Sequence, residues 1–374
     1  MITKFHEVSG KTLVTDDHSL WYHILDGTFH RTKWLAAEHG FNKGLTFKEI
    51  LSKLQVNYNK SNEFEKYDWT QEPSKSWEEL MKDHALYFRD KYDYLSILYS
   101  GGQDSQYILN IFLENKIKVD EIIVYRSQLP GFDNDYINTE PDTIALPYLS
   151  QLDMTNIGSP LVTIHSIDSW DIMNEYLSLE WSFKNSSNLL QRTPMNAAQM
   201  TIPRRPGNSV MLRGTTEPCV YYDKKLDKFY AQIWDTDNHI DGHQTKIKTP
   251  FYTSPEYPKI HAKQCHIVKN WLRKNISFIN ILNSSEEYKT MYANLVRGGA
   301  NKRINTKSPF FNKKSGDKIF TEKKSIHFVK QLRQINNDLF NNYMGTANSL
   351  LRGMVLQEYN RHSLGVNFGK FYLE

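Results

Sequence analysis

Cysteine is scarce in this chain of 374 residues, which contains only Cys219 and Cys265. Two thiols cannot form a disulfide framework, a four-cysteine zinc site or an iron–sulfur cluster held by the chain alone. Long apolar runs are also missing, because none approaches the roughly 20 residues that a membrane-spanning helix needs. The first residues lack the basic-then-apolar order of a signal peptide. We therefore expect a cytoplasmic protein that makes no contact with a membrane.

An excess of charge of one sign is absent as well: 46 lysines and arginines face 42 aspartates and glutamates, a net charge of +4. A dedicated nucleic-acid binder carries a denser basic surface. This balance therefore does not favour a nucleic acid as the partner, although it does not exclude one. A hydrophobic content of 39% and an aromatic content of 13% are enough to build a substantial core.

Apolar spacing predicts that strands and helices alternate in the middle of the chain. Ser76 and Glu79 form the sequence pattern of a capping box, and apolar residues at helical spacing follow, which predicts a helix over 77–91. Short apolar runs predict strands at 94–99, 121–125, 161–165 and 209–213, with helices after the first and across 139–152. This alternation predicts an α/β fold in which a mostly parallel, doubly wound sheet is covered by helices on both faces.

The chain divides into three expected parts. Residues 1–75 mix short apolar stretches with polar turns, which is typical of a small α+β lead-in. Residues 76–253 hold the predicted sheet, and residues 254–374 hold a helical region with helices at about 256–273, 285–297 and 321–342. Because ligands bind at the carboxyl ends of the strands in such sheets, we expect function in the loops that follow the strands.

A glycine-containing loop follows the first of these strands. Its residues are Ser100, Gly101, Gly102, Gln103, Asp104 and Ser105. Two glycines permit positive φ and close approach, so that successive N–H groups point into one concavity at a helix N-terminus and can hold an anion. The serine hydroxyls add donors, and an acid such as Asp104 inside a phosphate site is explained by Mg²⁺. The fingerprints of dinucleotide binding and of γ-phosphoryl transfer are both absent.

This loop resembles the signature S-G-G-x-D-[ST] of the PP-loop ATP pyrophosphatases, and it matches every fixed position in the same strand–loop–helix context. The resemblance implies an adenine nucleotide α-hydrolase-like fold. It also implies that ATP is bound with Mg²⁺, that ATP is cleaved between the α- and β-phosphates, and that AMP is transferred to a substrate oxygen. Asp104 would then be both the catalytic carboxylate and a metal ligand.

Within that superfamily, the chain is most similar to the synthetase domain of asparagine synthetases. That similarity implies that Tyr125, Arg126 and Ser127, at the end of the second strand, frame the adenine. It also implies that the turn after 209–213 helps to bind magnesium pyrophosphate, with Gly214 as a nucleotide-binding residue and Glu217 as a metal ligand. The paired acids of the family are missing from this turn.

Two further features of that family bear on the chain. A lysine on a later helix supports the transition state, and Lys263 is the candidate here, with Lys259 in reserve. The glutamine-dependent members begin with a cysteine after the initiator methionine, whereas this chain has Ile2, and residues 1–75 are too short for a glutaminase domain. We therefore expect a small-molecule substrate and a separate ammonia or amine donor.

Several alternatives stay open. The same loop occurs in sulfur transferases that thiolate tRNA or small molecules, where Cys219 would be the nucleophile, and in proteins that bind nucleotides without catalysis. His165 is a candidate for substrate contact, and Arg192, Arg204 and Arg205 are candidates for an acidic-substrate clamp. His261 and Cys265 share a helix face at zinc-ligand spacing, but without further ligands core packing is the favoured interpretation. The basic stretch 301–325 is interpreted as a soluble surface loop.

Overall fold

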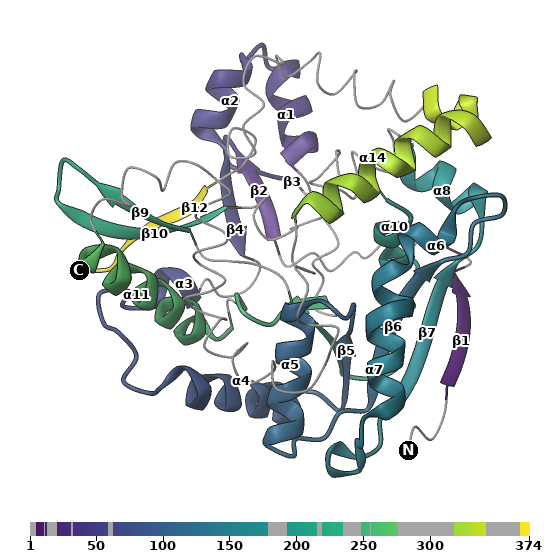
Figure 1. The fold of residues 1–374 in the computed structure, drawn as a ribbon. Helices are drawn as coiled ribbons and strands as arrows, with labels where there is room; N and C mark the ends of the chain where they lie inside the picture. The colour runs from purple at the N-terminus through teal and green to yellow at the C-terminus, as the bar shows by residue number, and fades with distance from the viewer. Residues whose placement is uncertain are drawn as a thin grey trace.

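The computed structural model describes residues 5–10, 12, 21–30, 33–58, 63–178, 193–214, 219–234, 248–254, 256–275, 318–341 and 367–374. A six-stranded sheet lies at its centre, and all of its neighbouring strands are parallel (Figure 1). In order across the sheet, its strands are β1 (Phe5–Gly10), β7 (Leu161–Ile167), β6 (Glu121–Ser127), β5 (Tyr94–Leu98), β8 (Ser209–Arg213) and β11 (Lys248–Pro250).

Helices cover both faces of this sheet, which confirms the predicted α/β class with a parallel sheet. Residues along β5 alternate between the faces: Ile97 belongs to the larger apolar cluster and Leu98 to a separate one. The larger cluster takes in α4 (Trp77–Lys91), α5 (Gln103–Glu114) and α7 (Leu146–Gln151). Clusters on the other side take in α8 (Trp170–Leu177), α10 (Pro194–Met200) and α14 (Lys318–Ile335).

Local signals in the sequence locate α4 well. Its bounds are those predicted, and the capping box is complete, because the Ser76 side chain accepts from the N–H of Glu79 while the Glu79 carboxylate accepts from the N–H of Ser76. Trp77, Leu80 and Phe88 lie on its buried face. A helix of fifteen residues is thus fixed by one polar cap and one apolar stripe.

The single helix predicted across 139–152 is wrong in detail. The chain instead forms α6 (Asn134–Ile137), a π-helical turn over Pro141–Ala145, and then α7. Pro147 has no N–H to offer to the preceding turn, and the N–H of Leu146 bonds to the carbonyl of Pro141, five residues back. The wider turn brings the backbone of Ala145 against the glycine loop.

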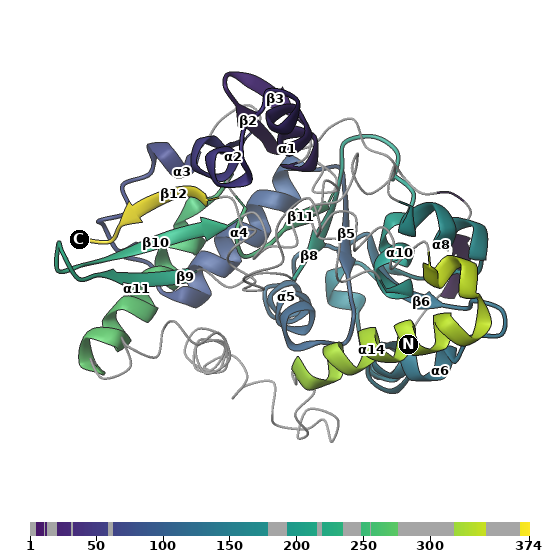
Figure 2. The same cartoon turned by 90° about the horizontal axis from the view of Figure 1, so that it is seen from above.

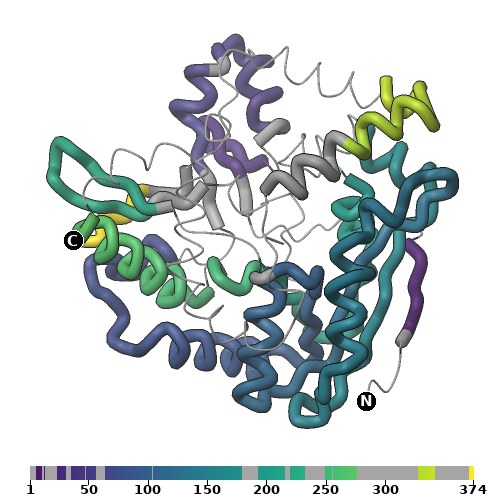
Figure 3. The backbone as a smooth tube through the Cα atoms, in the orientation of Figure 1, coloured from purple at the N-terminus to yellow at the C-terminus, as the bar shows by residue number. Residues whose placement is uncertain are grey.

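Both ends of the described chain contribute strands to sheets that other parts of the sequence build (Figure 3). β1 lies within the expected lead-in but pairs with β7 of the central sheet. β12 (Asn367–Tyr372) lies within the expected helical region but pairs with β10 (Lys228–Trp234), which also pairs with β9 (Cys219–Asp223). Each expected boundary, at residue 75 and at residue 253, therefore falls between strands that belong to the same sheet.

The remaining elements surround this framework. The lead-in also forms a small antiparallel sheet of β2 (Trp21–Leu25), β3 (Thr28–His30) and β4 (Gln55–Tyr58), with α1 (Lys33–Asn42), α2 (Phe47–Lys53) and α3 (Glu63–Lys66). The helix predicted at 256–273 is α11 (Pro258–Lys274), whereas the one predicted at 285–297 lies outside the described residues. Among the helices that are described, none is both long and apolar enough to cross a membrane.

A buried carboxylate holds the amino ends of the strands together. Glu121, whose side chain is 2% exposed, accepts two bonds from the Arg205 guanidinium, at 2.7 Å from Nε and 2.6 Å from Nη2. Hydroxyl groups from the neighbouring strands, those of Ser96 and Thr163, donate to the same carboxylate at 3.1 and 2.6 Å. Arg205 is thus bound at the edge of the sheet opposite to the glycine loop, and its suggested part in a substrate clamp is wrong.

Replacing Arg205 by alanine should destabilise the protein by about 3–5 kcal/mol, because it leaves a buried carboxylate without its counter-ion. Urea unfolding measures this loss. The adjacent Arg204 is exposed, and Arg204→Ala is the matched control, with an expected change of about 0.5 kcal/mol or less. A loss of similar size in both variants would show that the buried pair has no special role in stability.

Candidate functional site

The order of the strands reverses next to the glycine loop. From β5 the chain moves outward to β6 and β7, and it then returns to β8 on the opposite side of β5. Leu98, at the end of β5, lies in register with Arg213, at the end of β8. In open α/β sheets, ligands bind at such a switch point outside the carboxyl ends of the strands. Residues 100–105 and Gly214 therefore meet where a ligand is expected.

The loop itself is a compact turn at the start of α5. Gly101 has φ +80°, a conformation that side chains rarely adopt, and a Cβ there would lie 3.0 Å from the backbone nitrogen of Ala145. The Gly102 N–H donates to the Ser100 hydroxyl at 3.2 Å, and the Ser105 hydroxyl donates to the Gly102 carbonyl at 3.0 Å. Gly102 is the N-cap of α5 and brings no side chain to the first N–H groups of this helix. Those groups and the helix dipole suit an anion.

Gly214, which follows β8, and Tyr252, which follows β11, both contact this loop. A Cβ on Gly214 would lie 2.7 Å from the carbonyl carbon of Asp104 and 2.8 Å from the nitrogen of Ser105, so only glycine fits. The hydroxyl of Tyr252, which is fully buried, donates to the carbonyl oxygen of Asp104 at 2.7 Å. The loop is therefore held by backbone contact on one side and by a hydrogen bond on the other. Sequence reasoning found Gly214 but not Tyr252, which carries no local signal.

Tyr125 is the centre of a polar group beside the loop. Its pKa is raised, first by burial and then by the charge of Glu140, while the charge of Arg213 and hydrogen bonds with Gln199 and Ser100 lower it. Arg213 is the last residue of β8, and only 5% of its surface is exposed. Sequence reasoning did not select Arg213 or Gln199. A signal for Arg213 was present, since it is a charged residue at the end of an apolar strand, directly before the glycine.

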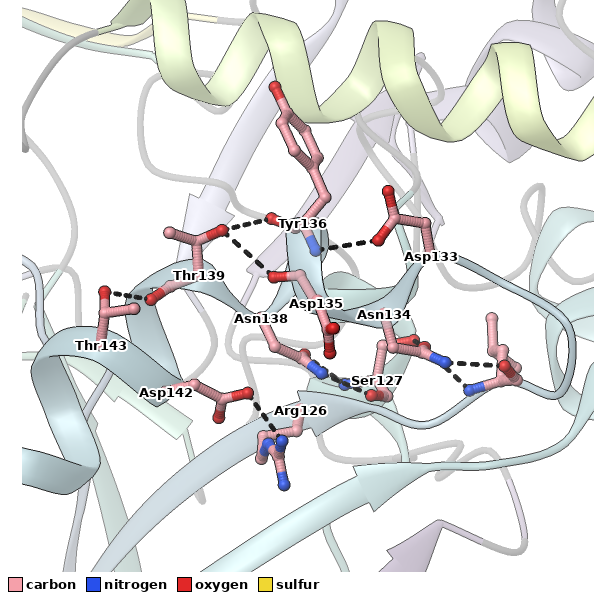
Figure 4. A network of polar contacts seen from close by, with 11 residues as sticks. Arg126, Ser127, Asp133, Asn134, Asp135, Tyr136, Asn138, Thr139, Asp142 and Thr143 are labelled. Carbon is pink, nitrogen blue, oxygen red and sulfur yellow. Dashed lines mark hydrogen bonds and ion pairs between the residues drawn. The ribbon is translucent and has the colours of Figure 1, made fainter.

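Arg126 and Ser127 are both engaged by the segment that follows β6 (Figure 4). The Arg126 guanidinium bonds to the Asp142 carboxylate at 2.7 Å. The N–H of Ser127 donates to the Asn138 side chain at 2.8 Å, and that side chain donates back to the Ser127 carbonyl at 2.7 Å. The Ser127 hydroxyl donates to Asn134 at 2.7 Å. These two predicted adenine contacts therefore position the segment at the edge of the site.

Other predicted residues are not brought to this site. The Lys263 ammonium bonds to the Glu72 carboxylate at 2.7 Å and to the Pro73 carbonyl at 3.0 Å. Lys259, the reserve candidate, is exposed. His165 is buried within β7, where Nε2 lies 2.7 Å from the Thr201 hydroxyl. Glu217, Arg192 and the side chains of Gln103 and Cys219 lie outside the described residues, as does the basic stretch 301–325 up to residue 317. Residues 318–325 begin the helix α14, so the interpretation of this part of the stretch as a loop is wrong.

The donor set around Asp104 fits magnesium bound together with phosphate. Mg²⁺ is held in such sites by one or two carboxylates, with phosphate oxygens and water completing its shell. Asp104 supplies one carboxylate in the first turn of α5, next to N–H groups and hydroxyls that suit the phosphates. No cluster of three or more histidines, cysteines or acids that could hold a metal occurs in the described part of the chain. The phosphates would therefore have to complete the metal shell.

The suggested zinc pair is part of the core. His261 and Cys265 on α11 are 1% and 0% exposed, and the His261 ring packs edge-on against Phe64 and Trp69. Burial raises the pKa of the Cys265 thiol well above its usual value, so this thiol stays protonated. Core packing, the favoured interpretation, agrees with these positions.

Two buried histidines should make the protein sensitive to acid. Burial lowers the pKa of His84 and of His261 to about 3, an effect that a backbone hydrogen bond at Phe251 opposes for His84. In the unfolded chain both would titrate near 6.5. The free energy of unfolding is therefore not reduced by these histidines above pH 6.5. It falls by about 1.4 kcal/mol per pH unit and per histidine as the pH drops towards 3.

Urea unfolding between pH 7 and pH 4.5 measures this effect. His261→Phe keeps an aromatic ring among Phe64 and Trp69 and removes the group that titrates, so this variant should lose roughly 2.5 kcal/mol less than the unsubstituted protein over that range. An equal loss in both proteins would contradict the assignment of a neutral, buried His261.

Comparison with models of known protein families finds no match for this chain, and comparison with curated proteins finds none that is significantly similar. The class of site is therefore defined by its geometry: a glycine loop opens a helix at the switch point of a parallel α/β sheet, with one carboxylate and one buried guanidinium beside it. Such a site can neutralise a polyphosphate and can share a divalent cation with it.

Proposed function

We propose that the protein is an ATP-dependent ligase that forms AMP and pyrophosphate. It adenylates a carboxylate or carbonyl oxygen of a small substrate and then lets a nitrogen nucleophile displace AMP, as asparagine synthetases do. The observation that carries this proposal is the loop 100–105, in which a positive-φ glycine leads into the uncapped start of α5 and Gly214 packs against the backbone. The resemblance of this loop to the PP-loop ATP pyrophosphatases supplies the reaction.

In the proposed reaction a substrate oxygen attacks the α-phosphorus, the bond to the bridging oxygen breaks, and pyrophosphate leaves with its electrons. The N–H groups at the start of α5 bind the leaving pyrophosphate, and Asp104 would hold Mg²⁺, which supplies positive charge for the phosphates when it is bound. Arg213 is better located than Lys263 to offset charge on the α-phosphate, because Arg213 ends β8 at the switch point. Lys263 is occupied by Glu72.

Nitrogen is favoured over sulfur as the nucleophile. Thiol chemistry needs an accessible thiolate, and Cys265 is fully buried with a raised pKa. The side chain of Cys219 lies outside the described residues. The sulfur transferase and the non-catalytic nucleotide binder stay as the outcomes that an experiment must separate.

The products of ATP turnover test this proposal. The protein is incubated with ATP labelled at the α-phosphate, Mg²⁺, ammonia and pools of carboxylic acids whose carboxylates carry ¹⁸O. We expect AMP and pyrophosphate, with one ¹⁸O atom transferred into AMP, because the attacking oxygen stays on the α-phosphorus. Formation of ADP and phosphate would contradict the proposal.

Two parallel measurements separate the alternatives. Product that forms with a persulfide donor but not with amines would identify the sulfur transferase. A melting temperature that rises with Mg-ATP without turnover would identify a nucleotide binder, since ligand at 100 times its dissociation constant adds about 2.7 kcal/mol of stability. A melting temperature that does not change with ATP would remove the nucleotide assignment altogether.

A further inference from the structure

Helix α14 packs on the segment that follows β6, and Figure 2 shows it alongside α6. Asp133 contacts two residues of α14. The Asp133 N–H donates to Oε1 of Gln331 at 2.9 Å, and the Asp133 carboxylate lies 3.0 Å from Nε2 of His327. The His327 ring also lies 4.2 Å from that of Tyr136, centroid to centroid. Phe328 is fully buried below these contacts, 5.8 Å from the Phe132 ring. Four contacts thus fasten α14 to one short stretch of chain.

The same stretch contacts the end of β6 and the glycine loop, which belong to the candidate nucleotide site. Asp133 caps α6 by accepting the N–H of Tyr136 at 3.2 Å (Figure 4). Asn134 and Asn138 follow Asp133 in the chain, and their side chains bond to Ser127 at the end of β6. Residues 141–145 then bring Asp142 to Arg126 and the Ala145 backbone to the glycine loop. One continuous set of contacts therefore runs from α14 to both the expected adenine end and the expected phosphate end of the site.

The location of α14 in the sequence makes this contact informative. Almost 200 residues separate Asp133 from Gln331, so docking α14 costs conformational entropy that local folding does not recover. The polar pair at Asp133 is partly exposed, with 41% of the Asp133 side chain accessible, and pairs of this kind shift an equilibrium about fivefold or less. The polar pair is therefore the weaker part of the contact, beside the fully buried Phe328, and it is the part that anything else that orders residues 128–145 would reinforce.

We propose that α14 is a clasp for the nucleotide site, in which His327 and Gln331 are positioning residues that act through Asp133. The clasp holds residues 128–145 in the conformation that binds nucleotide. Because coupling between two sites is reciprocal, nucleotide binding and α14 docking stabilise each other. This inference rests on the proposed function only in taking ATP as the ligand, and it assigns to the C-terminal part of the chain a role in nucleotide affinity.

The test compares nucleotide affinity with protection of α14. In the double variant His327→Phe/Gln331→Leu, an aromatic ring against Tyr136 is kept and both polar contacts with Asp133 are removed. The matched control is Gln334→Leu, the same change at an exposed position of the same helix. Titration calorimetry gives the dissociation constant of Mg-ATP, and hydrogen exchange reports on residues 318–335 and 128–145 with and without nucleotide.

We expect Mg-ATP to slow exchange in α14 of the unsubstituted protein and of the control. The double variant should bind Mg-ATP up to about fivefold more weakly, with a raised KM and an unchanged kcat, because no group that touches the reacting atoms is altered. The single variant His327→Gln has a side-chain donor for Asp133 and keeps Gln331, so its affinity for Mg-ATP should be close to that of the unsubstituted protein.

The outcomes distinguish this inference from the proposed function. Equal affinity of the double variant and the control, or exchange in α14 that does not respond to Mg-ATP, would overturn the clasp and leave the ligase proposal standing. Failure of the unsubstituted protein to bind Mg-ATP would overturn both. Loss of kcat without a change in affinity would also contradict a positioning role.

Discussion

Asp104→Ala should abolish the release of pyrophosphate from Mg-ATP, with a loss of at least about 10²–10³-fold in rate. Asp104 is the only acid in the first turn of α5, so its removal leaves the phosphates without the carboxylate that shares Mg²⁺ with them. The fold should survive. An acid at a helix N-terminus contributes only about 0.3–1 kcal/mol through the helix dipole. Pyrophosphate release measured at saturating Mg-ATP, with the unfolding midpoint recorded in parallel, gives both quantities.

The control for this experiment is Asp90→Ala, which removes an exposed acid from α4 and should leave the rate unchanged. Asp104→Asn keeps the size of the side chain and removes the charge, so it should resemble the alanine variant in rate. Pyrophosphate release at the normal rate from Asp104→Ala would reject the assignment of the site.

Gly214→Ala should destabilise the protein by about 1–3 kcal/mol and prevent tight binding of ATP. The added Cβ would lie under 3 Å from three atoms of Asp104 and Ser105, two of which are backbone atoms that no rotamer change can move aside. Relief requires the loop to shift away from β8, which moves the N–H groups at the start of α5. Calorimetric titration with Mg-ATP and urea unfolding measure the two effects.

Gly207→Ala separates this clash from ordinary backbone strain. Gly207 has φ +70° but nothing within 4 Å of its Cβ position, so alanine there should cost about 1 kcal/mol in stability and nothing in affinity. If Gly214→Ala bound ATP as tightly as Gly207→Ala, the close packing of β8 on the loop would have no functional meaning.

The parts of the site that sequence reasoning found are those with local signals. The glycine loop and α4 are specified by residues within a few positions of each other, through a positive-φ glycine and a capping box. Strand β1 has no such signal, because its partner β7 lies far along the sequence. The sequence shows the prolines at 141 and 147, but the π-helical turn depends on which carbonyl each of the remaining N–H groups bonds to.

Two arginines show most clearly what cannot be predicted from the sequence. Arg205 and Arg213 flank the same strand, and the sequence does not reveal which charge each of them meets. Arg205 lies before β8 and binds Glu121 at the amino edge of the sheet, whereas Arg213 ends the strand at the carboxyl edge beside Tyr125. Lys263 likewise lies on the helix that the sequence predicts, but only the packing of that helix reveals that it faces Glu72. Long-range pairing decides each of these outcomes.

The parallel pairing of β1 with β7 has a consequence for synthesis of the chain. Phe5 lies in register with Val162, so β1 leaves the ribosome roughly 150 residues before its partner, which corresponds to about 8–30 s at ordinary elongation rates. During that interval β1 is an unpaired strand segment, and until it docks, β7 remains an open sheet edge of the kind that invites aggregation. The strand that comes first in the sequence thus waits for its partner while β5 and β6 are synthesised, and a chaperone that shields it would act before β8 completes the candidate site.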